Sequence, residues 1–256
     1  MRHASLFTGI GGFDLAAHWM GWTNVFQVEI DPFCQQILAK RFPQTDKHID
    51  VKAFDGAPYR GSVDIISGGF PCQPYSAAGK RLGKADARHL WPEMLRIICE
   101  VRPTYVVGEN VYGLLNWNGG MVFEEVKADL ASQGYQVARV VLPACAVGAD
   151  HQRKRTWIVA YADGFGFEGG VHAENGEIAI RNDSKPLHGR ENEIPTWENI
   201  LSKPRICGGI DGFSSRMDRL RIKALGNAIV PQVVYQIFKT IVATTNPPIL
   251  PPMYNP

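Results

Sequence analysis

Residues 3–12 read His3-Ala4-Ser5-Leu6-Phe7-Thr8-Gly9-Ile10-Gly11-Gly12, a short apolar run that passes directly into a glycine-rich turn. The apolar run predicts a strand over residues 3–7, and the amphipathic stretch after the turn predicts a helix over residues 12–20. Glycine lets the backbone of the turn approach a ligand closely. This order favours an α/β fold with a ligand at the turn, although such a turn also suits an ordinary tight connection.

The same alternation continues through the first two-thirds of the chain. Apolar runs that favour strands alternate with amphipathic stretches that favour helices, which is the pattern of βαβ units stacked around a mostly parallel sheet. No internal repeat is present. The predicted strands span residues 3–7, 24–29, 63–67, 105–109, 135–143 and 156–161, and the predicted helices span residues 12–20, 32–41, 90–101 and 121–133.

The last third of the chain is organised differently. Over residues 163–213 the periodicity disappears and glycine, asparagine and charged residues dominate, which predicts a small separate lobe or a long functional excursion. Periodicity returns at Arg216 and predicts a helix over residues 227–243. The proline-rich residues 247–256 predict a loose tail.

Composition indicates one sizeable core. The 256 residues are 45% hydrophobic, and no apolar run reaches the roughly 20 residues that span a membrane, so we expect a soluble protein. Five cysteines without a Cys-x-x-Cys pair, and no signal peptide, argue against a zinc or dithiol centre and favour a reducing cytosol. The net charge of +2 decides nothing about partners, but residues 161–215 carry nine acidic and five basic side chains. The basic surplus therefore lies on the flanking sequence.

Two acidic residues follow predicted strands in the first part of the chain. Glu29 ends the strand 24–29, about 20 residues after the glycine turn, where a carboxylate can accept hydrogen bonds from both hydroxyls of a ribose. Asp50 follows a short third strand candidate and could contact an adenine amino group. Each is by default an ordinary surface acid. Because ligands bind beyond the carboxyl ends of such strands, the series favours a nucleoside site.

A cysteine lies in an irregular segment directly after the strand 63–67. The segment Gly68-Gly69-Phe70-Pro71-Cys72-Gln73-Pro74-Tyr75-Ser76 contains two glycines and two prolines, so it can neither continue a sheet nor begin an ordinary helix. The chain should bend around Cys72 and present its thiol, which suits a nucleophile. The alternative is a buried small hydrophobic residue, as many free cysteines are.

Further charged residues are expected at the same edge of the sheet. Glu109-Asn110-Val111 closes the strand 105–109, where burial would raise the pKa of the Glu109 carboxyl and let it donate or share a proton. Arg153 and Arg155 precede the strand 156–161, and both would point to one side if the extended conformation begins there. A basic cluster is also typical of a solvated face.

Taken in order, these segments resemble the motifs of DNA (cytosine-5)-methyltransferases of the bacterial or phage type. The resemblance covers residues 5–160 and 216–233, and includes a final motif at Leu225-Gly226-Asn227-Ala228-Ile229-Val230-Pro231. It implies the Rossmann-like α/β fold of methyltransferases that use S-adenosylmethionine as the methyl donor. The implied catalytic domain spans residues 1–160 and 216–246, a small irregular target-recognition region spans 161–215, and a tail spans 247–256.

The resemblance implies a role for each matched residue. Cys72 would add to carbon 6 of a cytosine flipped out of the duplex, while Glu109 stabilises the charge that develops in the ring. Arg153 and Arg155 would hold the cytosine carbonyl and a nearby phosphate, and carbon 5 would take the methyl group from S-adenosylmethionine. The residues implied to bind S-adenosylmethionine are Phe7, Gly9, Ile10, Gly11, Gly12, Glu29, Ile30, Asp50, Pro71, Leu90, Asn227 and Ala228.

Contacts to double-stranded DNA are expected from the segment that follows Cys72 and from individual lysine and arginine residues of the recognition region. The candidates are Gln73, Ser76, Lys80, Arg81, Arg88, Arg181, Lys185, Arg190, Lys203 and Arg205. The pattern departs from the family at two places. His151 replaces the glutamine usual two residues before the first arginine, with Gln152 shifted by one place, and the ninth motif is reduced to residues around 216–220.

Three other functions stay open. A tRNA cytosine-5 methyltransferase would share the chemistry, but the chain lacks the Cys-Phe-Thr tripeptide of that branch. A nicotinamide-dependent oxidoreductase would explain the glycine turn and Glu29 but would leave Cys72 and Glu109 without a role, and a non-catalytic DNA-binding protein would be expected to lack one of the latter two. We expect a monomer without a metal, in the cytoplasm of a bacterium or phage-infected cell. A cognate restriction endonuclease is a candidate partner. No segment of the sequence identifies the bases of the target site.

Overall fold

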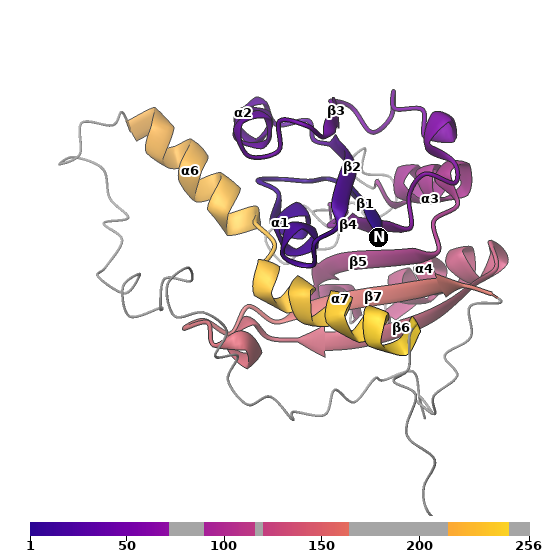
Figure 1. The fold of residues 1–256 in the computed structure, drawn as a ribbon. Coiled ribbons are helices and arrows are strands. Elements are labelled where there is room, and N and C mark those ends of the chain that lie inside the picture. The colour runs from indigo at the N-terminus through magenta and orange to yellow at the C-terminus, as the bar shows by residue number, and fades with distance from the viewer. Residues whose placement is uncertain (72–89, 116–119, 164–214, 246–256) are drawn as a thin grey trace, which may run out of the picture.

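A computed structural model describes residues 1–71, 90–115, 120–163 and 215–245 of the chain. Within these residues one sheet of seven strands has the order β3-β2-β1-β4-β5-β7-β6 (Figure 1). Strands β1 to β5 pair in parallel with one another, and β7 is antiparallel to both β5 and β6. The mostly parallel α/β sheet predicted from the sequence is thereby confirmed. The strands are β1 (Arg2–Leu6), β2 (Thr23–Val28), β3 (Asp46–His48), β4 (Ile65–Gly68), β5 (Tyr105–Val111), β6 (Tyr135–Leu142) and β7 (Arg155–Ala162).

Helices cover both faces of the sheet (Figure 1). α1 (Gly12–Trp19) and α7 (Pro231–Thr245) pack on one face, where Phe13, Trp157 and Phe238 belong to a common buried cluster. α3 (Trp91–Val101) and α4 (Met121–Ser132) pack on the other face, around Met94 and Ile158. The remaining helical elements are α2 (Pro32–Arg41), α6 (Ser215–Asn227) and the 3-10 turns η1 (Ala57–Tyr59), η4 (Tyr112–Leu115) and η6 (Ala144–Val147). No helix in the described ranges is long and apolar enough to cross a membrane.

Nearly all predicted elements are confirmed to within two residues at either end, but the carboxy-terminal helix is not. The prediction of one helix over residues 227–243 is wrong, because α6 ends at Asn227 and α7 begins at Pro231. Proline has no backbone N–H and disfavours the helical conformation in the residue before it, so it fits the first position of a new helix. The residues 228–230 therefore form a connection between two helices. Residues 164–214 and 246–256 lie outside the described part of the chain.

The order of the strands places the ligand site. From β1 the chain adds β2 and β3 on one side, whereas β4 and β5 lie on the other side of β1. In sheets of this kind ligands bind beyond the carboxyl ends of the strands, where the order switches direction. The glycine turn follows β1 and residues 69–71 follow β4, so both segments lie at this edge of the sheet.

Candidate functional site

The turn after β1 has a left-handed backbone and an open face. The φ angle is +53° at Phe7, +58° at Gly9 and +87° at Gly11. Gly11 N–H closes the turn with a hydrogen bond of 3.1 Å to the carbonyl of Thr8. A β-carbon at Gly9 would meet no atom within 4 Å, so a ligand can approach the backbone there. The flanking Ile10 is half-buried.

Glu29 follows β2 and its carboxylate is directed back to this turn. Oε2 accepts a hydrogen bond from the Gly9 N–H at 2.6 Å, and Oε1 accepts one from the Asp31 N–H at 2.7 Å. Each oxygen keeps a further lone pair, so the fixed carboxylate can still accept a hydrogen bond from a ribose hydroxyl. Ile30, beside it, is 67% exposed and offers apolar surface on which a base can pack.

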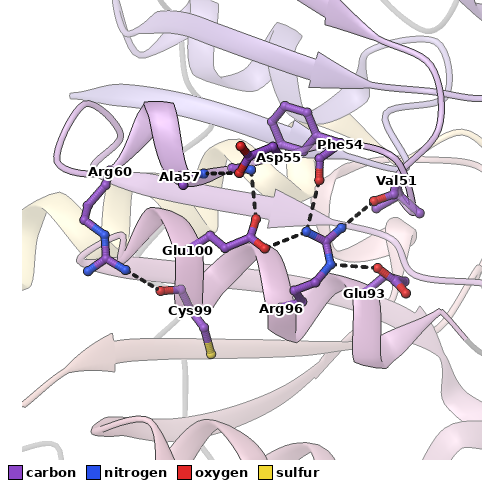
Figure 2. Close-up of polar contacts among 10 residues, drawn as sticks. Val51, Phe54, Asp55, Ala57, Arg60, Glu93, Arg96, Cys99 and Glu100 are labelled. Atoms are coloured by element: carbon purple, nitrogen blue, oxygen red, sulfur yellow. Dashed lines mark hydrogen bonds and ion pairs between the residues drawn. The ribbon is translucent and has the colours of Figure 1, made fainter.

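The loop after β3 carries Asp50 and is fastened to α3 (Figure 2). Arg96 on α3 donates hydrogen bonds to the carbonyls of Val51 at 2.7 Å and Phe54 at 3.0 Å. The Glu100 carboxylate, 2.6 Å from the Arg96 guanidinium, orients it. The position of Asp50 relative to Glu29 and Ile30 therefore depends on a helix more than 40 residues later in the chain.

A partly buried ion pair lies at the carboxyl end of β5. Arg155 Nε, on the neighbouring strand β7, is 2.9 Å from Glu109 Oε1. Burial raises the pKa of the Glu109 carboxyl, and the charges of Arg155 and Arg153 oppose that rise. A carboxyl group of this kind can share a proton with a ligand while the guanidinium fixes its orientation.

Asn110, the next residue of β5, connects this pair to the segment after β4. Its Nδ2 donates a buried hydrogen bond of 3.2 Å to the carbonyl of Phe70. The ring of Phe70 packs on Trp91, the first residue of α3, with 5.3 Å between the ring centroids. The chain beyond Phe70 leads through the half-buried Pro71 to residue 72. The structure thus fixes the start of that segment beside the strand that carries Glu109.

Several predicted site residues lie outside the described part of the chain. Cys72 is one of them. The others are the predicted DNA contacts Gln73, Ser76, Lys80, Arg81, Arg88, Arg181, Lys185, Arg190, Lys203 and Arg205. Leu90, predicted to help bind the cofactor, is described and is the half-buried residue preceding α3.

Arg153 does not share a strand face with Arg155. The extended conformation begins at Arg155, and the φ angle of Arg153 is +32°, so Arg153 lies outside the alternation of β7. Its guanidinium instead donates from Nη1 to the carbonyl of Gly226 at 2.9 Å and from Nη2 to the carbonyl of Ala228 at 2.8 Å. The expectation of two parallel arginines is corrected, because the left-handed backbone directs them to different partners.

The connection between α6 and α7 lies against the glycine turn and the end of β4. A β-carbon at Gly12 would be 2.7 Å from the Ile229 carbonyl oxygen, and one at Gly69 would be 3.5 Å from Ile229 Cδ1 and 3.3 Å from Glu109 Oε2. The absence of side chains at the two glycines lets this segment approach. Asn227, predicted to contact the cofactor, is the exposed last residue of α6, and Ala228, the first residue of the connection, is half-buried.

Sequence reasoning missed four residues that shape the site, because each acts through a partner distant in the chain. They are Arg96, Asn110, Ile229 and Lys223, the last of which lies 2.7 Å from Asp31. The segments Glu109-Asn110-Val111 and Leu225–Pro231 were local signals for Asn110 and Ile229, whereas Arg96 and Lys223 had none. Among the described residues, no group of three or more histidine, cysteine, aspartate and glutamate side chains could hold a metal ion.

Comparison with known proteins gives consistent matches. A family model described as C-5 cytosine-specific DNA methylase matches residues 1–209. Type II methyltransferase M.Eco47II of Escherichia coli is 38% identical over 170 residues, which are 64% of this chain and 41% of that protein. Type II methyltransferase M.AquIA of Picosynechococcus is 34% identical over 175 residues, or 60% of this chain and 69% of that protein. The chain therefore spans less than half the length of the first relative.

A solved structure supports the fold. The methyltransferase EhMeth of Entamoeba histolytica superimposes with a TM-score of 0.65 over 96% of this chain and 99% of its own, at 15% identity. At that identity the likeness concerns the fold alone.

Proposed function

The chain belongs to the C-5 cytosine-specific DNA methylase family, and from this premise we propose that it transfers a methyl group from S-adenosylmethionine to carbon 5 of a cytosine in DNA. The observation that carries the proposal is the Glu109–Arg155 pair of 2.9 Å, held beside the segment that leads to Cys72. An ordinary nucleotide-binding sheet has no need of a paired, partly buried carboxyl and guanidinium at this strand end.

The residues around the glycine turn fit S-adenosylmethionine. The open backbone at Gly9 and the fixed carboxylate of Glu29 suit the polar part of a nucleoside, and the exposed Ile30 suits its base. Asp50 would meet the adenine amino group from the loop that Arg96 fastens. When bound there, S-adenosylmethionine supplies a methyl group on a positively charged sulfur.

The residues at β4 and β5 would activate the cytosine, since its carbon 5 is too weak a nucleophile by itself. The Cys72 thiolate adds to carbon 6, while the Glu109 carboxyl hydrogen-bonds ring nitrogen 3 and the amino group and stabilises the negative charge. Carbon 5 becomes enamine-like and takes up the methyl group. A water or hydroxide then removes the carbon 5 proton, and the Cys72 thiolate leaves by elimination.

Arg155 and Asn110 would position these groups. Arg155 orients Glu109 and places a positive charge where the cytosine carbonyl is expected. Asn110 holds the Phe70 carbonyl and so keeps the start of the Cys72 segment next to Glu109. Since the target atoms are unreachable in stacked DNA, the cytosine would be flipped out of the duplex.

The function is tested with duplex DNA of mixed sequence and S-adenosylmethionine labelled in its methyl group. We expect label in 5-methylcytosine after digestion to nucleosides and mass spectrometry. A duplex that contains 5-fluorocytosine should form an adduct stable to denaturation, because fluorine cannot leave as a proton does. Bisulfite sequencing of the product then identifies the target site.

Two cysteine variants make this test specific. Cys72→Ala should abolish both the methylation and the adduct. Cys145→Ala removes an exposed thiol in η6 and should retain both. The proposal would be refuted if wild-type protein binds S-adenosylmethionine but neither methylates DNA nor forms the adduct with 5-fluorocytosine. Label found in tRNA alone would mean that the substrate is RNA.

A further inference from the structure

We propose that Arg153 is a positioning residue that clamps the connection between α6 and α7 onto the cofactor turn, so that affinity for S-adenosylmethionine depends on it. The inference rests on the proposed function and deepens it. It separates the two arginines of the site, since Arg155 pairs with Glu109 while Arg153 acts on the cofactor side.

The clamp consists of two hydrogen bonds from one guanidinium. Nη1 of Arg153 reaches the carbonyl of Gly226 at 2.9 Å, and Nη2 reaches the carbonyl of Ala228 at 2.8 Å. These carbonyls lie on either side of Asn227, at the point where α6 ends. The last carbonyls of a helix have no partner within the helix, so a cation that binds them is favoured there. The planar fork of arginine can hold both at once, whereas a lysine ammonium acts as a single point.

The backbone of Arg153 supports the same role. Its φ of +32° is in the left-handed region, which a residue with a side chain rarely adopts. Such a conformation persists where the surrounding contacts determine it. The guanidinium, half-buried against the connection, provides these contacts.

The clamped segment touches both halves of the site. Its Ile229 carbonyl lies over Gly12, the first residue of α1 after the glycine turn, and its Ile229 side chain lies over Gly69 beside Glu109. Loss of Arg153 would therefore release this segment from Gly12 at the glycine turn and from Gly69. The ion pair between Glu109 and Arg155 uses other atoms and would remain.

The test measures binding of S-adenosylmethionine by calorimetry in the absence of DNA. Arg153→Ala removes the clamp, and Arg153→Lys keeps the positive charge near Glu109 but cannot bridge two carbonyls. We expect both variants to bind S-adenosylmethionine at least about tenfold more weakly than the wild type. The KM for S-adenosylmethionine should rise similarly, while the KM for DNA changes less than about threefold.

Arg102→Lys is the matched control. Arg102 also has a left-handed backbone, with φ +55°, and also donates from Nη1 to a carbonyl of another element, that of Gln133 at 3.0 Å. It lies between α3 and β5, at the opposite edge of the sheet from the site. We expect its substitution to leave the affinity for S-adenosylmethionine unchanged.

The outcomes separate the clamp from a direct contact with the base. If Arg153→Lys retains wild-type affinity for S-adenosylmethionine, or if both variants raise the KM for DNA instead, the inference is overturned. Equal losses in the Arg153 and Arg102 variants would also overturn it, since they would indicate general destabilisation. Wild-type protein that does not bind S-adenosylmethionine would contradict the proposed function itself, which is a distinguishable failure.

Discussion

Gly12 is a residue at which the glycine turn lies against the connection between α6 and α7. It begins α1, where alanine would favour the helix by up to about 1 kcal/mol. Its β-carbon would, however, lie 2.7 Å from the Ile229 carbonyl oxygen and 2.8 Å from Ile229 Cβ. A backbone carbonyl cannot rotate away as the end of a side chain can, so overpacking of about 1–3 kcal/mol should outweigh the gain.

Gly12→Ala is therefore expected to reduce the free energy of unfolding by about 1–2 kcal/mol and to weaken binding of S-adenosylmethionine. Urea denaturation and calorimetry measure the two effects. Gly113→Ala is the control, because the nearest atom to its β-carbon would be Val111 Cγ2 at 4.0 Å. Wild-type values for Gly12→Ala in both measurements would contradict the close approach of Ile229.

The residues that could be predicted were those whose role depends on their own strand. Glu29 and Glu109 each end an apolar run, and that position alone placed them at the carboxyl edge of the sheet. The partner of Arg153 could not be predicted, because Gly226 lies 73 residues later and the left-handed turn at Arg153 has no glycine to mark it. The spacing of two residues between Arg153 and Arg155 suggested that both lie on one face of a strand, but the strand begins only at Arg155.

Among the elements, α6 is joined to the start of α2 by an ion pair. Lys223 on α6 lies 2.7 Å from Asp31, which caps α2 and follows Glu29 and Ile30. The Lys223 side chain is 63% exposed, so solvent screens the pair and its contribution should not exceed about 1 kcal/mol. The pairing lowers the pKa of Asp31, so this contribution is present above the ordinary aspartate pKa of 3.8 and is lost as the pH falls below it.

A double-mutant cycle tests whether this pair couples α6 to the site. Asp31→Asn removes the charge but keeps an oxygen to cap α2, and Lys223→Gln removes the other charge. Each single variant and the double variant should bind S-adenosylmethionine about two- to fivefold more weakly, with the effect reduced in 1 M salt. Lys127→Gln, on α4 across the sheet, is the control. Strictly additive losses in the double variant would exclude coupling through the pair.

At the scale of elements, prediction succeeded where one signal dominated. Apolar runs predicted the strands closely, and the amphipathic stretch over residues 32–41 predicted α2, which the structure shows beginning at Pro32 after a capping Asp31. The prediction of one helix over residues 227–243 was wrong because apolar periodicity continues across a break between two helices. Pro231 was the sign of that break, but the periodic residues on either side outweighed it.

At the scale of the whole molecule, a buried polar layer beneath the glycine turn joins β1, β2, β4 and α1. His3 of β1 lies 2.7 Å from Asn24 Oδ1 and 2.7 Å from Ser67 Oγ, which joins β1 to β2 and β4. Asp14 of α1 accepts a hydrogen bond of 2.9 Å from Gln27. Both titratable side chains are fully buried, and burial lowers the pKa of His3 and raises that of Asp14.

Acid should destabilise this layer through His3. Its pKa lies below the ordinary 6.5, so the unfolded chain takes up a proton that the native state does not. The stability that His3 contributes is therefore present above about pH 6.5 and is lost as the pH falls, by up to about 1.4 kcal/mol per pH unit for one proton. Asp14 acts with the opposite sign, since its raised pKa lets the native state bind a proton that the unfolded chain lacks.

The contribution of His3 can be separated from that of Asp14 by comparing how steeply the free energy of unfolding changes with pH in wild type and variant. Urea unfolding between about pH 7 and pH 5 should give a free energy that falls less steeply with acidification in His3→Gln than in the wild type, because Asp14 is present in both. His18→Gln, in which an exposed histidine of α1 is replaced, controls for the loss of a histidine in general. Identical slopes for wild type and His3→Gln would mean that His3 takes up its proton equally in both states, contrary to its burial between three strands.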